Sequence, residues 1–178
     1  MIDPILVFDS VFGATSSSAS AVTLDAQGNI YVASQSSFTP VEAYGDISLT
    51  KWTASGNQLS YSINLGGNGT DRVSGLTVDS SSSAYLVGST TSPDFPVTPN
   101  AFQKNLTGSQ NAFVAKVNPS GTRLAYASLL GGGSEQTGGI AVDRSGAAYI
   151  TGTTLNNFPT TANAFQITPG ANCTATSP

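Results

Sequence analysis

The sequence predicts an all-β fold without helices, built from repeated four-stranded antiparallel units, and three observations support this prediction. First, residues 65–67 (Leu-Gly-Gly) return as residues 130–132, 65 positions later, and residues 75–79 return as residues 139–143. Second, only 9% of the residues are charged, and a chain rich in β-branched and small polar residues suits strands and turns. Third, turn signals recur at short intervals between apolar runs. A repeat of this length is one supersecondary unit that packs against copies of itself.

Each full copy of the repeat contains four apolar runs of strand length. The first two runs are apolar at successive positions, which is typical of strands covered on both faces. The third run ends at a glycine-containing turn in both copies, so that one hairpin follows another. With one isolated strand at the start of the chain, we expect eleven strands, at residues 5–13, 21–24, 30–33, 47–52, 59–62, 75–78, 84–87, 112–117, 124–127, 139–142 and 148–151.

Two side chains recur at fixed places in the first hairpin of every copy. An aspartate directly follows the first strand, where its carboxylate can accept hydrogen bonds from the amides of its own turn. A tyrosine occupies the second position of the second strand, and we interpret it as part of the core rather than as a sugar-stacking platform. Trp52, the single tryptophan, aligns with Val117 and is expected to serve packing as well. The recurring residues are Asp25, Asp79 and Asp143, and Tyr31, Tyr85 and Tyr149.

The loop between the second and third strands contains a second recurring motif. Residues 92–103 carry Phe-Pro followed by Ala-Phe-Gln, and residues 157–166 repeat both elements. The prolines limit the freedom of the loop, and we expect Phe95 and Phe102 to fix it to the sheet as two aromatic anchors. The first copy has only residues 36–44 at this place and lacks both elements.

These motifs resemble the bacterial β-propeller repeat known as the SBBP repeat. Its pattern runs Gly-Gly, a polar loop, Gly-Ile-Ala-Val-Asp, Ala-Tyr-Val-Thr-Gly, Asp-Phe-Pro, Ala-Phe-Gln, Ala-Phe-Val-Lys and Asn-Pro-Ser-Gly, and residues 65–166 follow it in order. The resemblance implies one four-stranded blade per repeat, arranged radially, in large secreted or cell-surface proteins. It implies no catalytic residues.

The repeat also predicts how the chain is organised. We expect one partial β-propeller over residues 1–178, with about three blades. Its parts are an orphan outer strand at 5–13, a degenerate blade at 14–66, a second blade at 67–131, and a half blade with a tail at 132–178.

Three blades do not close a ring, since propellers typically need four to eight. The half blade would leave an unpaired strand edge, and such edges attract other strands. We therefore expect self-association through unpaired strand edges, with completion by another chain or by a segment of a longer parent protein.

Composition excludes several partners. With Lys+Arg 6 against Asp+Glu 10, a net charge of −4 leaves no basic face for nucleic acid. No apolar run approaches the roughly 18 residues of a membrane span, and the N-terminus lacks a signal-peptide pattern. Together with the resemblance, this favours an extracellular or cell-surface protein whose signal peptide lies outside these residues. The single cysteine, Cys173, either has a free thiol or forms a disulfide with a cysteine of another chain or of a longer parent protein.

The sequence offers little catalytic chemistry. It contains no histidine, which excludes Ser-His-Asp triads and nearly all zinc sites. Glycosidases need two carboxylates that face one cleft, and the sequence distinguishes no pair among the four candidates. We expect no catalytic residue, no cofactor site and no metal site. The candidate carboxylates are Asp71, Asp79, Glu135 and Asp143.

One glycine-rich segment has an alternative interpretation. Residues 66–73 fit the Gly-Gly-x-Gly-x-Asp nonapeptide that binds calcium in β-rolls, where consecutive copies share each ion. Here the motif occurs once, and its counterpart at 131–136 has Ser134 and Gln136 in place of the glycine and the aspartate. We therefore interpret it as a connection between blades rather than a calcium site.

The leading functional hypothesis is a non-catalytic structural or interaction module of an extracellular bacterial propeller. A carbohydrate-binding or other ligand-binding propeller, which would use loops such as residues 92–110, is the alternative, with carbohydrate or a surface protein as the partner. A third hypothesis is the accessory part of a secreted hydrolase whose catalytic residues lie elsewhere.

Overall fold

The computed structural model describes residues 17–36, 46–133, 135–154 and 158–166, and these residues form strands and no helix. The described residues accordingly include no helix long and apolar enough to cross a membrane. The expected strand at 5–13 and Cys173 lie outside the described residues. The strands are β1 (Ser17–Leu24), β2 (Ile30–Ser36), β3 (Ile47–Trp52), β4 (Leu59–Leu65), β5 (Asp71–Val78), β6 (Ala84–Thr90), β7 (Asn111–Val117), β8 (Leu124–Leu130), β9 (Gln136–Val142) and β10 (Ala148–Thr153).

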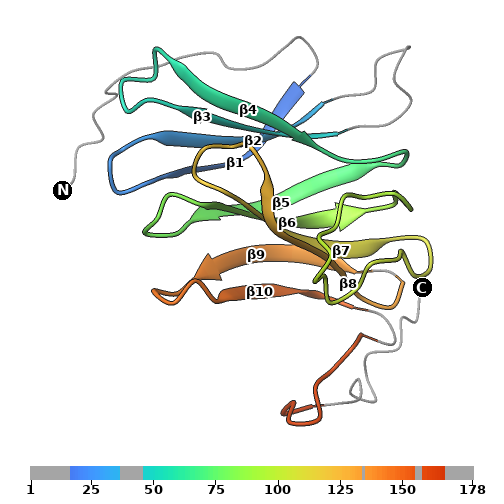
Figure 1. Cartoon of the computed structure of the whole chain (residues 1–178). Coiled ribbons are helices and arrows are strands. Elements are labelled where there is room, and N and C mark those ends of the chain that lie inside the picture. Colours follow the sequence, from blue (N-terminus) through green and yellow to red (C-terminus); the bar gives the residue numbers. More distant parts are fainter. Residues whose placement is uncertain (1–16, 37–45, 134, 155–157, 167–178) are drawn as a thin grey trace, which may run out of the picture.

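The strands form three separate antiparallel sheets, each a meander in chain order. The first sheet has the order β1-β2-β3-β4, the second β5-β6-β7-β8, and the third contains β9 and β10. Figure 1 shows the three sheets stacked face to face, with the second between the other two. The first strands of successive sheets, β1, β5 and β9, pack against each other in series. The two complete sheets lie within the expected blades 14–66 and 67–131.

The first strand of each sheet begins about four residues earlier than the sequence predicts. In β5, Asp71 to Val73 already pair with β6, and a bulge at Ser74 shifts the register before Gly75. The same bulge falls at Ser20 in β1 and at Gly138 in β9. A bulge breaks the alternation of side chains between the two faces, so these residues do not show the period of a strand.

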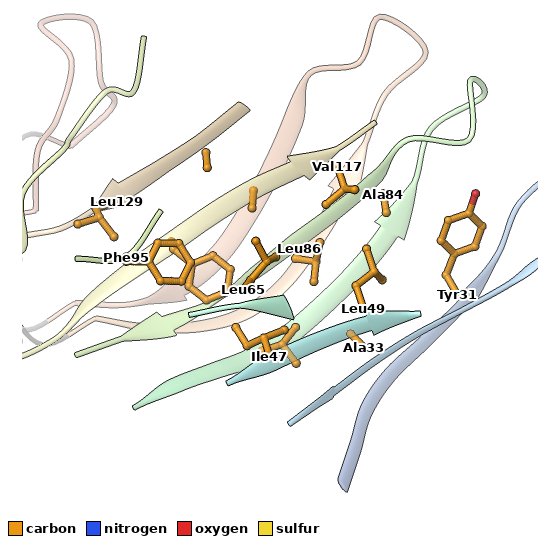
Figure 2. Close-up of a cluster of buried hydrophobic side chains, with 14 residues drawn as sticks. Tyr31, Ala33, Ile47, Leu49, Leu65, Ala84, Leu86, Phe95, Val117 and Leu129 are labelled. Atoms are coloured by element: carbon orange, nitrogen blue, oxygen red, sulfur yellow. The ribbon is translucent and has the colours of Figure 1, made fainter. Parts of the chain in front are cut away.

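The main core lies between the first two sheets. Ile47 and Leu49 of β3 are fully buried and lie toward Leu86 of β6 in Figure 2. Strands β6 and β7 are buried at nearly every position, on both faces, because a sheet covers each side of them. This confirms the expected coverage on both faces for β6, the second strand of the middle blade. The same expectation is wrong for β1, where Val22 and Leu24 are 67% and 58% exposed. Each large apolar side chain buried in β6 and β7 contributes about 1.5–3 kcal/mol.

A turn of the second sheet packs on a tyrosine of the first. Gly121, in the turn between β7 and β8, has a φ of 70°, and a Cβ at this position would overlap the ring of Tyr61. Replacing Gly121 with alanine should cost about 1–2 kcal/mol of folding free energy through the left-handed backbone. Overpacking against Tyr61 should add a further cost of about 1–3 kcal/mol.

Gly28 provides the matched control for this prediction. It lies in a turn of the first sheet with a φ of 80°, and a Cβ at this position would meet only the Cβ of Ala54 at 3.4 Å, an ordinary contact. Chemical denaturation of both variants should show a larger loss for Gly121→Ala than for Gly28→Ala. Equal losses would contradict the contact between the Gly121 turn and Tyr61.

Candidate functional site: the contacts between blades

Each of the three aspartates caps its own turn, as the sequence predicts. Asp25 Oδ1 accepts hydrogen bonds from the amides of Gln27 (3.1 Å) and Asn29 (2.9 Å). Asp79 and Asp143 bind the amides two and four residues further on in the same way, at 2.8–3.0 Å. One carboxylate oxygen therefore stabilises each turn, and the second oxygen is left for other contacts.

In each sheet the second carboxylate oxygen accepts a hydrogen bond from the tyrosine hydroxyl of the following strand. The hydroxyl of Tyr31 lies 3.2 Å from Asp25 Oδ2, and that of Tyr85 lies 3.1 Å from Asp79 Oδ2. Tyr149 and Asp143 repeat the contact at 3.1 Å. Strand β2 thus presents its tyrosine to the aspartate six residues earlier, and β6 and β10 do the same.

A lysine of the third strand completes the pair in both four-stranded sheets. Lys51 lies opposite Tyr31 across the ladder, with Nζ 3.5 Å from Asp25 Oδ2 and 4.9 Å from the centre of the tyrosine ring. Lys116 repeats this arrangement, with Nζ 3.0 Å from Asp79 Oδ2 and 4.7 Å from the ring of Tyr85. The ammonium group neutralises the carboxylate and stacks on the ring at once.

The tyrosines also connect each sheet to the next one. The hydroxyl of Tyr31 lies 3.0 Å from the carbonyl oxygen of Ser82, and that of Tyr85 lies 3.2 Å from the carbonyl oxygen of Gly146. Because a hydroxyl has a single proton, it is shared between the aspartate of its own sheet and the carbonyl of the next. We call an aspartate, its tyrosine and the carbonyl from the following sheet a latch.

The residue that supplies the carbonyl always has a left-handed backbone. Its φ is 63° at Ser82 and 86° at Gly146, and the equivalent residue of the first sheet, Gly28, has a φ of 80°. Serine is uncommon in this conformation. Ser82 is held there by its own hydroxyl, which donates to Asp25 Oδ2 at 3.1 Å. The first latch therefore has a second bond between sheets.

The latch shifts the pKa values of its members. Burial alone would raise the pKa of Asp25, but hydrogen bonds from Asn29, Ser82 and Gln27 outweigh it and lower the pKa to about 2. Burial is likewise outweighed at Asp79, where the Ser83 amide and Lys116 lower the pKa. Burial and the charge of Asp25 raise the pKa of Tyr31, so its proton stays in place.

The depressed pKa of Asp25 predicts acid sensitivity of the first latch. A carboxyl whose folded pKa lies below its unfolded value stabilises the fold above the unfolded value, near 4, and loses that contribution as pH falls through the folded one. A shift from 3.8 to about 2 corresponds to about 2 kcal/mol. The stability difference between the wild type and Asp25→Asn should therefore shrink between about pH 4 and pH 2.

Unfolding of both proteins by urea at several pH values measures this difference. Burial raises the pKa of Asp71, which gives that residue the opposite pH dependence. This effect is common to both proteins and cancels in the comparison. A difference that stayed constant from about pH 7 to pH 2 would contradict a role for the charge of Asp25.

The third latch is open within the described residues. Tyr149 is 61% exposed, whereas Tyr31 and Tyr85 are 0% and 3% exposed. The interpretation of these tyrosines as core is thus confirmed for the first two and wrong for Tyr149, whose sheet has no described neighbour on that face. Trp52 is half-buried on β3, and its Nε1 donates to Thr50 Oγ1 at 3.0 Å.

A second set of carboxylates lies at the start of the inner strands. Asp71 is fully buried and accepts hydrogen bonds from the Gly67 amide (2.9 Å) and Ser92 Oγ (2.8 Å). Glu135, 2% exposed, accepts from the amides of Gly132 (2.7 Å) and Gly133 (3.1 Å). Both side chains hold the glycine-rich connection that enters their sheet.

Glu135, rather than Gln136, is therefore the counterpart of Asp71, which corrects the alignment made from the sequence. Counting back from the paired strands, Asp71 lies opposite Thr90, and Glu135 contacts the equivalent Thr154. The glycine-rich connection that enters the third sheet is one residue shorter than the connection that enters the second sheet. Glu135 therefore lies three residues after Gly132, whose amide it binds, whereas Asp71 lies four residues after Gly67. The sequence alignment missed this because it matched the glycines and not the strands.

The residues of the possible calcium motif make contacts within the protein. Asn68 binds Asp94 through its backbone amide (2.7 Å) and its side chain (2.8 Å), while Gly67 binds Asp71. The described part of the chain contains no group of three or more His, Cys, Asp or Glu side chains placed to hold a metal ion. The four candidate carboxylates thus bind turns or connections, and the absence of a metal or cofactor stays a prediction.

The long loop before β7 is anchored by one phenylalanine and one glutamine. Phe95 is 3% exposed and packs on Phe113, with ring centres 4.7 Å apart, as predicted. The predicted second anchor is wrong, since Phe102 is 63% exposed. Instead Gln103 forms a β-bridge with Leu129, and its side chain accepts a hydrogen bond from the Gly131 amide at 3.0 Å. An amide side chain can satisfy buried backbone groups that a phenyl ring cannot.

Four-stranded antiparallel meanders, stacked face to face along their first strands, define the blades of a β-propeller, and the three sheets form part of one. Residues 60–96 and 125–159 match the family model described as a beta-propeller repeat, SBBP. These two segments are therefore similar to the SBBP repeat. Each matched segment runs from the last strand of one blade to the loop of the next, so it includes one junction between blades. No curated protein matches the chain.

Proposed function

We propose that this chain is a non-catalytic structural and interaction module of an extracellular bacterial β-propeller, completed by a strand from another chain or from a longer parent protein. The observation that carries the proposal is the open edge of the third sheet. Strand β10 pairs with β9 alone among the described residues, whereas the equivalent β6 pairs with both β5 and β7.

The exposure of β10 supports completion from outside. Five of its six residues are exposed, while six of the seven residues of β6 are buried. An unpaired strand presents a row of amides and carbonyls that a further strand can bind. The low charge of the chain leaves few lysines to protect such an edge, since only 9% of all residues are charged.

Hydrogen exchange of the backbone amides tests this proposal. Amides of β10 that point away from β9 should exchange rapidly in dilute protein and become protected as the concentration rises, because strand pairing then satisfies them. The amides of β6 form the internal control and should keep the same protection at every concentration. Rapid exchange of the outward β10 amides at all concentrations would overturn completion by a second copy of this chain and leave only a segment of a longer parent protein as the source of the strand.

A second candidate function is ligand binding by the loop at residues 92–110, and the exposure of Phe102 favours it. Phe165 repeats this residue in the last copy and is fully exposed as well. An exposed aromatic ring at the same place in two repeats can stack on the apolar face of a sugar. Glycan-array binding that is lost in Phe102→Ala would support this function, and an array without binding would contradict it. Asp94 is a poor probe, since it holds Asn68.

A further inference from the structure

The two closed latches describe how neighbouring blades of this chain recognise each other. Each joins a tyrosine of one sheet to the left-handed residue of the next, at 3.0 Å and 3.2 Å. The second junction also has a close contact at the bulge, where Ser74 Oγ of β5 lies 2.5 Å from Thr137 Oγ1 of β9. The latch therefore recurs at a fixed position in each junction, and the bulge marks a second point where the backbones of two sheets approach.

The two outer faces of the stack carry the two halves of this contact. On the third sheet, Tyr149 and Asp143 form a latch without its carbonyl. On the first sheet, Val22 and Leu24 are 67% and 58% exposed. Their equivalents in the second sheet, Leu76 and Val78, pack against the core between the first two sheets.

The first sheet also carries the acceptor that the open latch lacks. Gly28 occupies the place of Ser82 and Gly146, with a φ of 80° that directs its turn in the same way. One face thus offers a tyrosine donor, and the other offers a left-handed turn beside two exposed apolar side chains. The two outer faces are therefore complementary in the same way as the first and second sheets, where the tyrosine of one sheet contacts the left-handed turn of the next.

We propose that the open face of the β9–β10 sheet binds the first sheet of a second copy of this chain, with the Tyr149 hydroxyl donating to the Gly28 carbonyl. This inference rests on the proposed interaction module and names its partner. Such a contact is head-to-tail, and it closes into a ring only when the rotation allows. Two copies would supply about six sheets, which lies within the four to eight blades of closed propellers.

A disulfide designed on the internal junction tests the proposal. Relative to the bulges, Gly138 is equivalent to Ser74, and Ala19 is equivalent to Thr137. Two chains are therefore made, one with Ala19→Cys and one with Gly138→Cys, each with Cys173→Ser and one with a tag. The double variant Ser74→Cys/Thr137→Cys, also with Cys173→Ser, is the positive control and should form a bond within one chain.

The mixture of the two single-cysteine chains should form a disulfide-linked pair, seen as twice 18.0 kDa on a non-reducing gel. Each single-cysteine chain on its own should form at least about tenfold less of the disulfide-linked pair, because a head-to-tail contact never brings identical positions together. Adding Tyr149→Phe should slow the linkage about fivefold, the loss of one hydrogen bond. Tyr126→Phe on β8 serves as the matched control and should leave the rate unchanged.

The outcomes separate this inference from the proposed function. No more linkage in the mixture than in the single chains, with the positive control formed, overturns head-to-tail docking. If β10 still becomes protected with concentration, the proposed strand pairing stands without it. Linkage in the mixture without protection of β10 supports face-to-face docking and contradicts completion of the edge by a second copy of this chain.

Discussion

Replacing Asp25 with alanine should lower the free energy of unfolding by about 3–5 kcal/mol, the cost of removing one partner of a buried ion pair. The side chain of Asp25 is 1% exposed and that of Lys51 is 13% exposed. The change also removes the acceptor of the Gln27 and Asn29 amides and the bond from Ser82 across the blade junction. Chemical denaturation at neutral pH and at one fixed protein concentration measures the loss.

Asp143→Ala is the matched control for this prediction. Asp143 caps its turn and contacts Tyr149 as Asp25 does with Tyr31, but it is exposed and no described sheet covers its latch. The loss should therefore be markedly smaller at Asp143. Equal losses at the two positions would contradict the claim that the neighbouring blade gives the latch its strength.

Replacing Phe113 with alanine should lower the free energy of unfolding by a similar amount, about 3–5 kcal/mol. Phe113 is fully buried on β7, and its ring packs on Phe95, which fixes the long loop. The residue also fills the space over Gly88, where a Cβ would approach its ring. The cavity would therefore loosen both the sheet and the loop, and thermal or urea unfolding would detect the change.

Phe102→Ala is the matched control, because it removes an exposed aromatic ring and so shows how much of the stability loss at Phe113 comes from burial. Phe102 lies in the same loop and is 63% exposed, so its removal should change stability by no more than about 0.5 kcal/mol. A loss at Phe102 as large as that at Phe113 would mean that Phe102 is the buried anchor that the sequence suggested.

The sequence predicted the strands, their order and the antiparallel class because these features are local. The apolar runs and the glycine-containing turns recur in each copy, so strands β2 to β4 and β6 to β8 were found within a few residues. The starts of β1, β5 and β9 were missed, since the bulge at each of them hides the alternation on which a strand is recognised.

The contacts between blades could be predicted only in part. The cap of each turn by its aspartate follows from local spacing, and the sequence predicted it. The role of Lys51 and Lys116 depends on the pairing register, which places each lysine opposite the tyrosine of the neighbouring strand. The sequence pattern does not specify this register. The spacing of six between each aspartate and its tyrosine was a signal that could have been read. The carbonyl of Ser82 carries no such signal, because a backbone atom is present at every position.

Sedimentation equilibrium tests most directly whether another chain completes this stack of blades. Head-to-tail docking predicts a mass that rises with concentration from 18.0 kDa to at least twice this value. The same experiment on Tyr149→Phe should show the rise at about fivefold higher concentration. A single species of 18.0 kDa at every concentration would contradict the account.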